Sequence, residues 1–175
     1  MRISTWTTTA AATVDAMSER TTVLAAAGVA VGAAVLAAWA ARKAARAPGV
    51  RVVATDAAPA AIGPYVQATR DGLGTVYVSG QVGFVPGTKN LDGTTAAAQA
   101  RRALSNIRAI LEAAGSSMDR VLKTTVLLTN IADYAEVNAV YAEAFGNHKP
   151  ARAAFAVKDL PAGAIVEIDC IALER

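Results

Sequence analysis

The spacing of apolar residues along the chain predicts several short strands and two helices. Alternation with a period of two predicts a strand at 75–82 and, within 148–170, two strands that form a hairpin. A short strand is also predicted at 51–55, and a run rich in β-branched residues predicts another at 120–130. Apolar residues three and four positions apart predict two helices, at 94–114 and 134–145. The expected order is therefore β-β-β-α-β-α-β-β, in which one of the three early strands is left without bounds.

The ends of both predicted helices carry residues typical of helix caps. Gly115 and Gly146 stand where a left-handed residue commonly ends a helix. Asp133 precedes the second helix and Glu136 follows three residues later, which predicts a capping box. The turn of the final hairpin is expected at 158–163, which contains Pro161.

Two helices of these lengths can cover one face of a single sheet, which makes the fold class α+β with two layers. The other face of the sheet then stays open. We expect Val78, Val126, Leu128 and the small residues of the last hairpin to make this open face apolar. An exposed apolar sheet face favours self-association.

The first 49 residues differ from the rest of the chain. Residues 1–22 are rich in Ser and Thr, and we expect them to be flexible. Residues 23–41 contain no charge and form an apolar run of the length of a membrane-spanning helix, with Trp39 near its end. A basic linker at 42–49 follows, and the folded domain is expected at 50–175.

Three interpretations of 23–41 remain open: a retained single-pass transmembrane anchor, a cleaved targeting sequence and an Ala-rich helix of a soluble protein. An anchor is the first expectation, because the basic residues directly after the apolar run are typical of the cytosolic or matrix-facing side of a membrane. The corresponding location is an organelle, with the mitochondrion expected before the plastid.

Charge and cysteine content exclude several functions. The net charge of +3 lies wholly in the first 49 residues, since 50–175 contain twelve basic and twelve acidic residues. A neutral domain without a basic stripe argues against a nucleic-acid partner. Cys170 is the single cysteine, which excludes an internal disulfide and a cysteine-based zinc site. We expect Cys170 in the core and His148 in a surface loop.

Two charges within the predicted hairpin are the candidate chemistry. Alternation places Arg152 on the same side of its strand as Ala154, and a hairpin would bring it within a few residue pairs of Glu167. Both charges could simply reach solvent at a sheet edge. Alternatively, the arginine fork could bind a carboxylate or phosphate, and the glutamate could orient a water or act as a general base.

Five stretches in order resemble one known family. They read "APAAIGPYVQA", "VYVSGQVG", "AAQARRALSNIRAILEAAG", "VLKTTVLLTNIADYAEVNAVY" and "KPARAAFAVKDLPAGAIVEI". These stretches resemble the RidA/YjgF/UK114-like enamine/imine deaminases from about Ala54 to Arg175. The resemblance implies a chorismate-mutase-like (YjgF-like) α+β fold with a mixed sheet, assembled as homotrimers whose sheets form a barrel. It also implies hydrolysis of 2-imino acids in clefts between subunits, without a cofactor or metal.

The resemblance also assigns roles to individual residues. Arg152 matches the arginine that binds the substrate carboxylate, and Glu167 matches the glutamate that positions the attacking water. The residues matching the remainder of the cleft are Tyr65, Ser79, Gly80, Asn138 and Ala154. Many bacterial members carry cysteine where this chain has Ala154, so thiol-dependent regulation at that position is excluded, whereas activity is not.

The sequence therefore predicts a deaminase of small 2-imino acids such as 2-iminobutanoate and 2-iminopropanoate, tethered to a membrane or targeted to an organelle. The alternative is an accessory subunit of an organellar membrane complex, which the apolar segment motivates because fold alone does not determine function. A third interpretation, a ribonuclease or translation inhibitor, is weakened by the neutral domain.

Overall fold

The computed structural model describes residues 34–38 and 49–175, and the chain divides into two units, Met1–Ala47 and Pro48–Arg175. Residues 34–38 are helical. The remainder of the predicted hydrophobic helix at 23–41, the segment 1–22 and nearly all of the linker 42–49 lie outside the described residues. Within the described ranges, no helix has both the length and the apolar character needed to cross a membrane.

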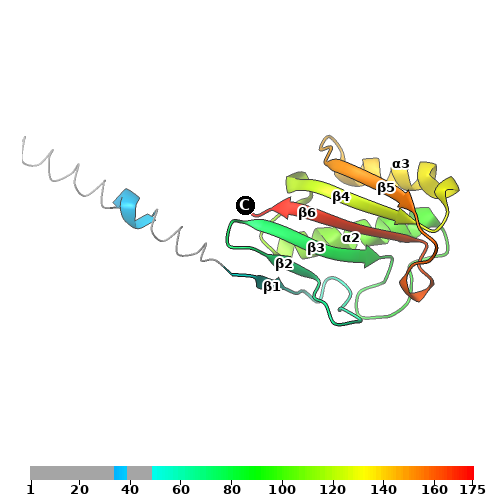
Figure 1. The fold of residues 1–175 in the computed structure, drawn as a ribbon, viewed down its shortest axis with the longest axis horizontal. Coiled ribbons are helices and arrows are strands. Elements are labelled where there is room, and N and C mark those ends of the chain that lie inside the picture. The colour runs from blue at the N-terminus through cyan, green and yellow to red at the C-terminus, as the bar shows by residue number, and fades with distance from the viewer. Residues whose placement is uncertain (1–33, 39–48) are drawn as a thin grey trace, which may run out of the picture. The chain divides into compact units, whose positions relative to one another are not determined.

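The second unit contains the order of strands and helices that the sequence predicts (Figure 1). Its strands are β1 (Arg51–Val53), β2 (Ala68–Arg70), β3 (Thr75–Val82), β4 (Val121–Leu128), β5 (Ala151–Ala156) and β6 (Val166–Leu173). Its α-helices are α2 (Ala96–Ala113) and α3 (Tyr134–Phe145), and three single-turn 3-10 helices are η1 (Met118–Arg120), η2 (Ile131–Asp133) and η3 (Pro161–Gly163).

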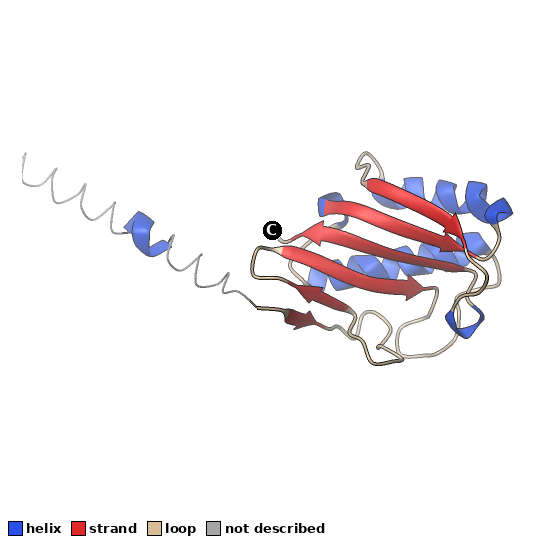
Figure 2. Cartoon of the chain, in the orientation of Figure 1, coloured by secondary structure: helices blue, strands red, loops and turns tan. Residues whose placement is uncertain are grey.

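The six strands form one mixed sheet in the order β1-β2-β3-β6-β4-β5. β4 and β5 run parallel, and every other neighbouring pair is antiparallel. Both α-helices pack on the same face of this sheet, and the other face is open (Figure 2). The predicted two-layer α+β fold is therefore confirmed.

The core lies between the helices and the covered face of the sheet. α2 contributes Ile107, Ile110 and Leu111, which are fully buried. Alternate residues of β6 pack against these side chains from the sheet. Among them, Ile168 is 0% exposed and Cys170 is 1% exposed. Burying this apolar surface is the main driving force for folding, at about 25 cal/mol per Å².

The predicted hairpin at 148–170 is wrong. β5 and β6 are both strands, but β4 lies between them and pairs with each. The connection from β5 to β6 passes across the end of β4, with Val157 donating to the Leu128 carbonyl and Thr129 donating to the Ile165 carbonyl. Alternation identifies a strand and its two faces, but it contains no information about which strand becomes the neighbour.

The prediction of which residues face outward on the open side is also wrong. Val78, Val126 and Leu128 lie beneath the helices and are at most 4% exposed. The open face instead carries the residues between them in the alternation, including Leu127 and Phe155, which pair across β4 and β5. Phe155 is 54% exposed, so an apolar side chain does lie on this face.

The helix ends follow the predicted pattern except at the start of α3. Gly115, which follows the Ala114 C-cap of α2, has φ of 76°, and Gly146 caps α3 with φ of 56°. Asp133 makes no capping hydrogen bond through its side chain, so the predicted capping box is wrong. The chain already turns in η2, where the Asn130 side chain accepts from the Ala132 N–H, and α3 continues from that turn.

Candidate functional site

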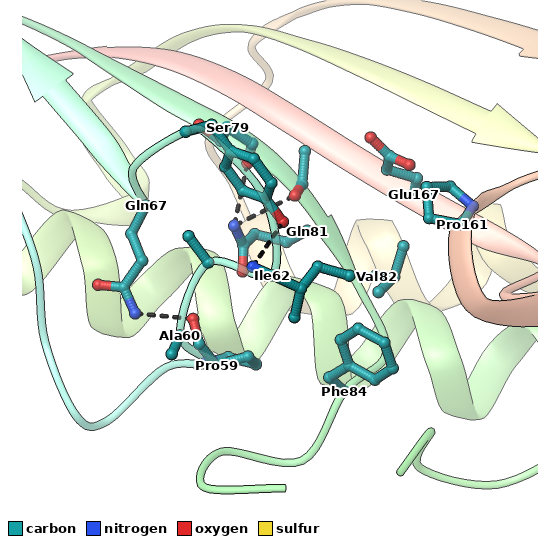
Figure 3. A pocket seen from close by; sticks show the side chains of 13 residues that line it. Pro59, Ala60, Ile62, Gln67, Ser79, Gln81, Val82, Phe84, Pro161 and Glu167 are labelled. Carbon is teal, nitrogen blue, oxygen red and sulfur yellow. Dashed lines mark hydrogen bonds between the residues drawn. The ribbon is translucent and has the colours of Figure 1, made fainter. Parts of the chain in front are cut away.

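A cavity of about 360 Å³ opens beside β3 and β6. Its lining comprises Pro59, Ala60, Ala61, Ile62, Tyr65, Gln67, Ser79, Gly80, Gln81, Val82, Phe84, Pro161 and Glu167. Figure 3 shows Glu167 and Pro161 on one side of the cavity and Gln67 with Pro59 on the other. The walls come from the loop before β2, from β3 and the residues after it, from η3 and from β6.

The loop before β2 is held in place by Gln67. Its side-chain amide donates to the carbonyls of Thr55, Ala58 and Pro59 and accepts from the Thr55 N–H at 2.6 Å. A buried amide with this many backbone partners replaces the hydrogen bonds that an irregular loop lacks. Sequence reasoning missed Gln67. A signal was available, since a long polar side chain directly before a strand, after a Pro/Gly-rich loop, needs backbone partners if it is buried.

Ser79 and Gly80 shape the floor of the cavity. The Ser79 hydroxyl donates to the Val66 carbonyl at 2.6 Å, which joins β3 to the end of the loop. The pairing of β3 with β6 shifts register between Val78 and Gln81, so Ser79 and Gly80 leave the regular ladder. A β-bulge of this kind re-aims the chain next to a site.

Gly80 permits the close approach of the Glu167 carboxyl group. A Cβ atom at position 80 would lie 1.9 Å from Glu167 Oε1 and 2.8 Å from its Cδ. No side chain fits in that space without displacing the carboxylate. The glycine is required for the position of Glu167 rather than for an unusual backbone angle.

Glu167 lies on the open face of β6 and is partly buried in the cavity wall. Burial raises the pKa of this carboxyl above its ordinary value of 4.5, and the nearby negative charge of Asp169 raises the pKa further. None of the ion pairs within 34–38 and 49–175 involves Glu167. A desolvated carboxylate with no cation beside it is able to bind and orient a water or to accept a proton.

Arg152 lies on the opposite face of the sheet from Glu167. It pairs with Thr124 across β4 and β5, and Thr124 pairs with Cys170 across β4 and β6. Glu167 pairs instead with Leu127, three residues further along β4. Paired residues share a face and successive residues alternate, so Arg152 faces the helices whereas Glu167 faces away from them. Within one chain these two groups do not share a crevice.

The Arg152 guanidinium is held by two tyrosines of α3. Its Nη2 donates to the Tyr134 hydroxyl at 2.9 Å, and its Cζ lies 4.5 Å from the centroid of the Tyr141 ring. A guanidinium over an aromatic face is attracted by the negative face of the ring. In the part of the chain that the structure describes, no carboxylate forms an ion pair with Arg152. The arginine is exposed, so its remaining donors are available to a ligand.

The seven residues predicted for the site thus fall into two groups. Tyr65, Ser79, Gly80 and Glu167 line the cavity. Arg152, Asn138 and Ala154 do not. Ala154 shares the helix-facing side of β5 with Arg152, and Asn138 lies on α3 between the two tyrosines that hold the arginine. Sequence reasoning did not single out these two tyrosines. Their seven-residue spacing, two helical turns apart, was the available signal for a shared contact.

Neither His148 nor Cys170 belongs to the candidate site. The His148 ring Nε2 lies 2.7 Å from the Val121 carbonyl oxygen, which ties the loop after α3 to β4. Burial raises the pKa of the Cys170 thiol to about 12, so this core cysteine stays protonated and unreactive. Over the described residues, no three His, Cys, Asp or Glu side chains are grouped as metal ligands.

Comparison with known proteins identifies the family. The sequence model of the family described as Endoribonuclease L-PSP matches residues 55–174. The chain belongs to the RidA/YjgF/L-PSP family. The protein of this family named 2-iminobutanoate/2-iminopropanoate deaminase in Homo sapiens is 44% identical over 124 residues, which cover 71% of this chain and 90% of the human protein.

Solved structures of the RidA/YjgF/L-PSP family share the fold. The structure of the YjgF gene product of E. coli is 42% identical, with a TM-score of 0.67, and the match covers 71% of this chain and 99% of that one. The structure of E. coli TdcF with bound serine is 38% identical, with the same TM-score and the same coverage. The predicted YjgF-like fold is therefore confirmed for the second unit.

Proposed function

We propose that this protein hydrolyses 2-imino acids to 2-oxo acids and ammonia, with 2-iminobutanoate and 2-iminopropanoate as substrates. The observation that carries the proposal is a pair of opposite charges that the fold keeps on different faces of the sheet. Neither Glu167 nor Arg152 has an ion-pair partner within the described ranges. The human relative's name, and the serine bound to TdcF, support a small carboxylate-bearing substrate.

The proposed reaction needs orientation of the substrate and one delivered water. Arg152 binds the substrate carboxylate through two parallel N–H···O bonds. Glu167 orients a water, removes its proton as the oxygen attacks the imine carbon, and returns a proton to the nitrogen. The resulting tetrahedral intermediate carries a hydroxyl and an amino group. Glu167 transfers the hydroxyl proton to the nitrogen, and ammonia leaves as the C–N bond breaks and the carbonyl of the 2-oxo acid forms. No covalent enzyme intermediate is required.

The complete site in this proposal lies between two copies of the chain in a homotrimer. One copy supplies the cavity with Glu167, Tyr65, Ser79 and Gly80, and its neighbour supplies Arg152, Asn138 and Ala154. The exposed Phe155 on the open sheet face supports association, since an uncovered large apolar side chain favours burial against a partner.

The activity is tested with the purified full chain. Threonine dehydratase supplies 2-iminobutanoate, and the rate of 2-oxobutanoate release is measured with and without the protein. We expect clear acceleration by the wild type and a loss of at least about a hundredfold in Arg152→Ala, because the substrate carboxylate loses its anchor. The matched control is Arg101→Ala, which removes an exposed arginine from α2 and should leave the rate unchanged. A fully active, folded Arg152→Ala would disprove the assigned role.

The shared site is tested by complementation. Arg152→Ala and Glu167→Gln are co-expressed at equal amounts and purified together. In a ring of three with sites between neighbours, about a quarter of the sites then combine an intact arginine with an intact glutamate. We expect activity near a quarter of the wild type from the mixture, although each variant alone is inactive. Sites contained within single chains would leave the mixture inactive.

The location of the protein depends on 23–41, most of which lies outside the described residues. Sequencing the N-terminus of the mature protein separates a retained anchor from a cleaved targeting sequence. Detergent extraction followed by sizing addresses the alternative of an accessory subunit. A free trimer supports the enzyme, whereas co-migration with a large assembly that lacks deaminase activity supports the structural role.

A further inference from the structure

The guanidinium of Arg152 is held at two points, and the two contacts restrict different motions. The cation–π contact with Tyr141, with 4.5 Å from Cζ to the ring centroid, holds the guanidinium over the face of that ring. The hydrogen bond from Nη2 to the Tyr134 hydroxyl, at 2.9 Å, determines which edge of the guanidinium faces the helix. The Tyr134 ring itself is further away, with 5.7 Å from Cζ to its centroid.

Tyr141 is itself immobilised, so it provides a fixed surface for the stack. Its hydroxyl forms a 2.8 Å hydrogen bond with the Thr124 hydroxyl, and both residues are buried. Its ring also packs against Phe145 with a centroid separation of 4.5 Å. Tyr134 differs, because it is 40% exposed and lies in the first turn of α3. The two tyrosines therefore contribute rigidity and orientation, respectively.

A planar fork binds a carboxylate through two parallel hydrogen bonds only if the correct edge faces the ligand. The Tyr134 hydroxyl occupies one donor of Nη2, which leaves the other N–H groups for a ligand. We propose that Tyr134 is a positioning residue that sets the rotation of the Arg152 guanidinium, so that its unoccupied edge meets the substrate carboxylate. This inference rests on the proposed function, because it assigns the carboxylate as the ligand of Arg152.

The test is Tyr134→Phe in the full chain, which keeps the ring and removes only the hydroxyl. The carboxylate does not change during the reaction, so its binding is equally strong in the ground state and the transition state. We expect KM to rise about three- to tenfold while kcat changes less than about twofold. The melting temperature should stay unchanged. The control Ser105→Ala removes an exposed hydroxyl from α2 and should alter neither constant.

A double-mutant cycle separates positioning from direct contact with the substrate. Arg152→Lys replaces the fork by a point charge whose donors rotate freely and gain no orientation from Tyr134. We expect Tyr134→Phe to change kcat/KM by less than about twofold in the Arg152→Lys background. A loss as large as in the wild type would show that the hydroxyl acts on the substrate itself, and no loss in the wild-type background would show no role. Either result overturns the inference.

A measurement without catalysis distinguishes this inference from the proposed function. Calorimetric titration with 2-oxobutanoate reports carboxylate binding whether or not the chain hydrolyses imines. We expect Tyr134→Phe to weaken this binding by the same three- to tenfold factor. An inactive wild type that binds 2-oxobutanoate, with weaker binding in Tyr134→Phe, removes the proposed function and keeps the inference. If the wild type is active but Tyr134→Phe binds 2-oxobutanoate with an unchanged dissociation constant, the proposed function stands and the inference is overturned.

Discussion

The two faces of the sheet treat charge in opposite ways. On the open face, Glu167 sits in a cavity wall with a second acid, Asp169, nearby, and burial raises its pKa. On the helix-covered face, Arg152 is exposed, and its guanidinium lies over the Tyr141 ring rather than beside a carboxylate. Had the two groups shared a face, they could have formed an ion pair and neutralised each other. Their separation by one layer of backbone leaves neither group with an ion-pair partner among the described residues, and in the proposed site each chain contributes one of the two charges.

Among substitutions on the two faces, Glu167→Gln should have the largest effect on activity. The amide keeps the shape of the side chain but cannot act as a base, so we expect kcat to fall by about 10²–10⁴.

The same substitution should also change stability. Because folding raises the pKa of Glu167, the ionised carboxyl destabilises the folded state as the pH rises above 4.5, the ordinary pKa of this group. The variant should therefore be more stable than wild type at pH 7, with a smaller gain near pH 4. Thermal unfolding at both pH values checks the sign, and a less stable variant at pH 7 contradicts it.

Gly80→Ala should have the next largest effect. The new methyl group would lie 1.9 Å from Glu167 Oε1, so the carboxylate has to move. We expect a loss of about ten- to a hundredfold in kcat, because small displacements of a catalytic group are costly. In a Glu167→Gln background the same substitution should cause little additional loss. Additive losses in the double variant would mean that Gly80 acts independently of Glu167.

The pH dependence of kcat/KM should also distinguish the two faces. If Glu167 acts as the base, kcat/KM falls at acid pH as Glu167 becomes protonated. This fall should occur at a pH above 4.5, the ordinary pKa of a glutamate. Asp169→Asn removes the second cause of the raised pKa and should move this acid limb to lower pH. Burial, the larger cause, remains, so the limb should not return to the ordinary value. An acid limb that stays at the same pH in Asp169→Asn contradicts the assignment of Glu167 as the base.

The smallest effect on activity is expected from a substitution beside Arg152, on the helix-covered face. Tyr141→Phe keeps the ring beneath Arg152 and removes the hydroxyl bonded to Thr124. We expect a loss of about 1 kcal/mol in stability, because the buried Thr124 hydroxyl loses its partner, and little change in KM. Adding Thr124→Val should recover part of the loss, since the unpaired group is then gone. A large rise in KM would show that the ring moves and that the stack depends on this bond.

The sequence by itself determined the two helices, most of the strands, and which residues of a strand share a side. Arg152 shares a side with Ala154, and Glu167 shares one with Asp169, as alternation predicts, because the side-chain period of a strand is set by local geometry. The glycines that follow α2 and end α3 were predictable for the same local reason.

The tertiary structure alone decided which strands are neighbours, and hence where the two charges lie relative to each other. Inserting β4 between β5 and β6 separates Arg152 from Glu167, because pairing depends on contacts between segments far apart in the chain. The same long-range packing brings Tyr134 and Tyr141 against Arg152 and places Gln67 beneath the loop. Local patterns in a sequence do not specify these contacts, because each one requires two distant segments to be folded against each other.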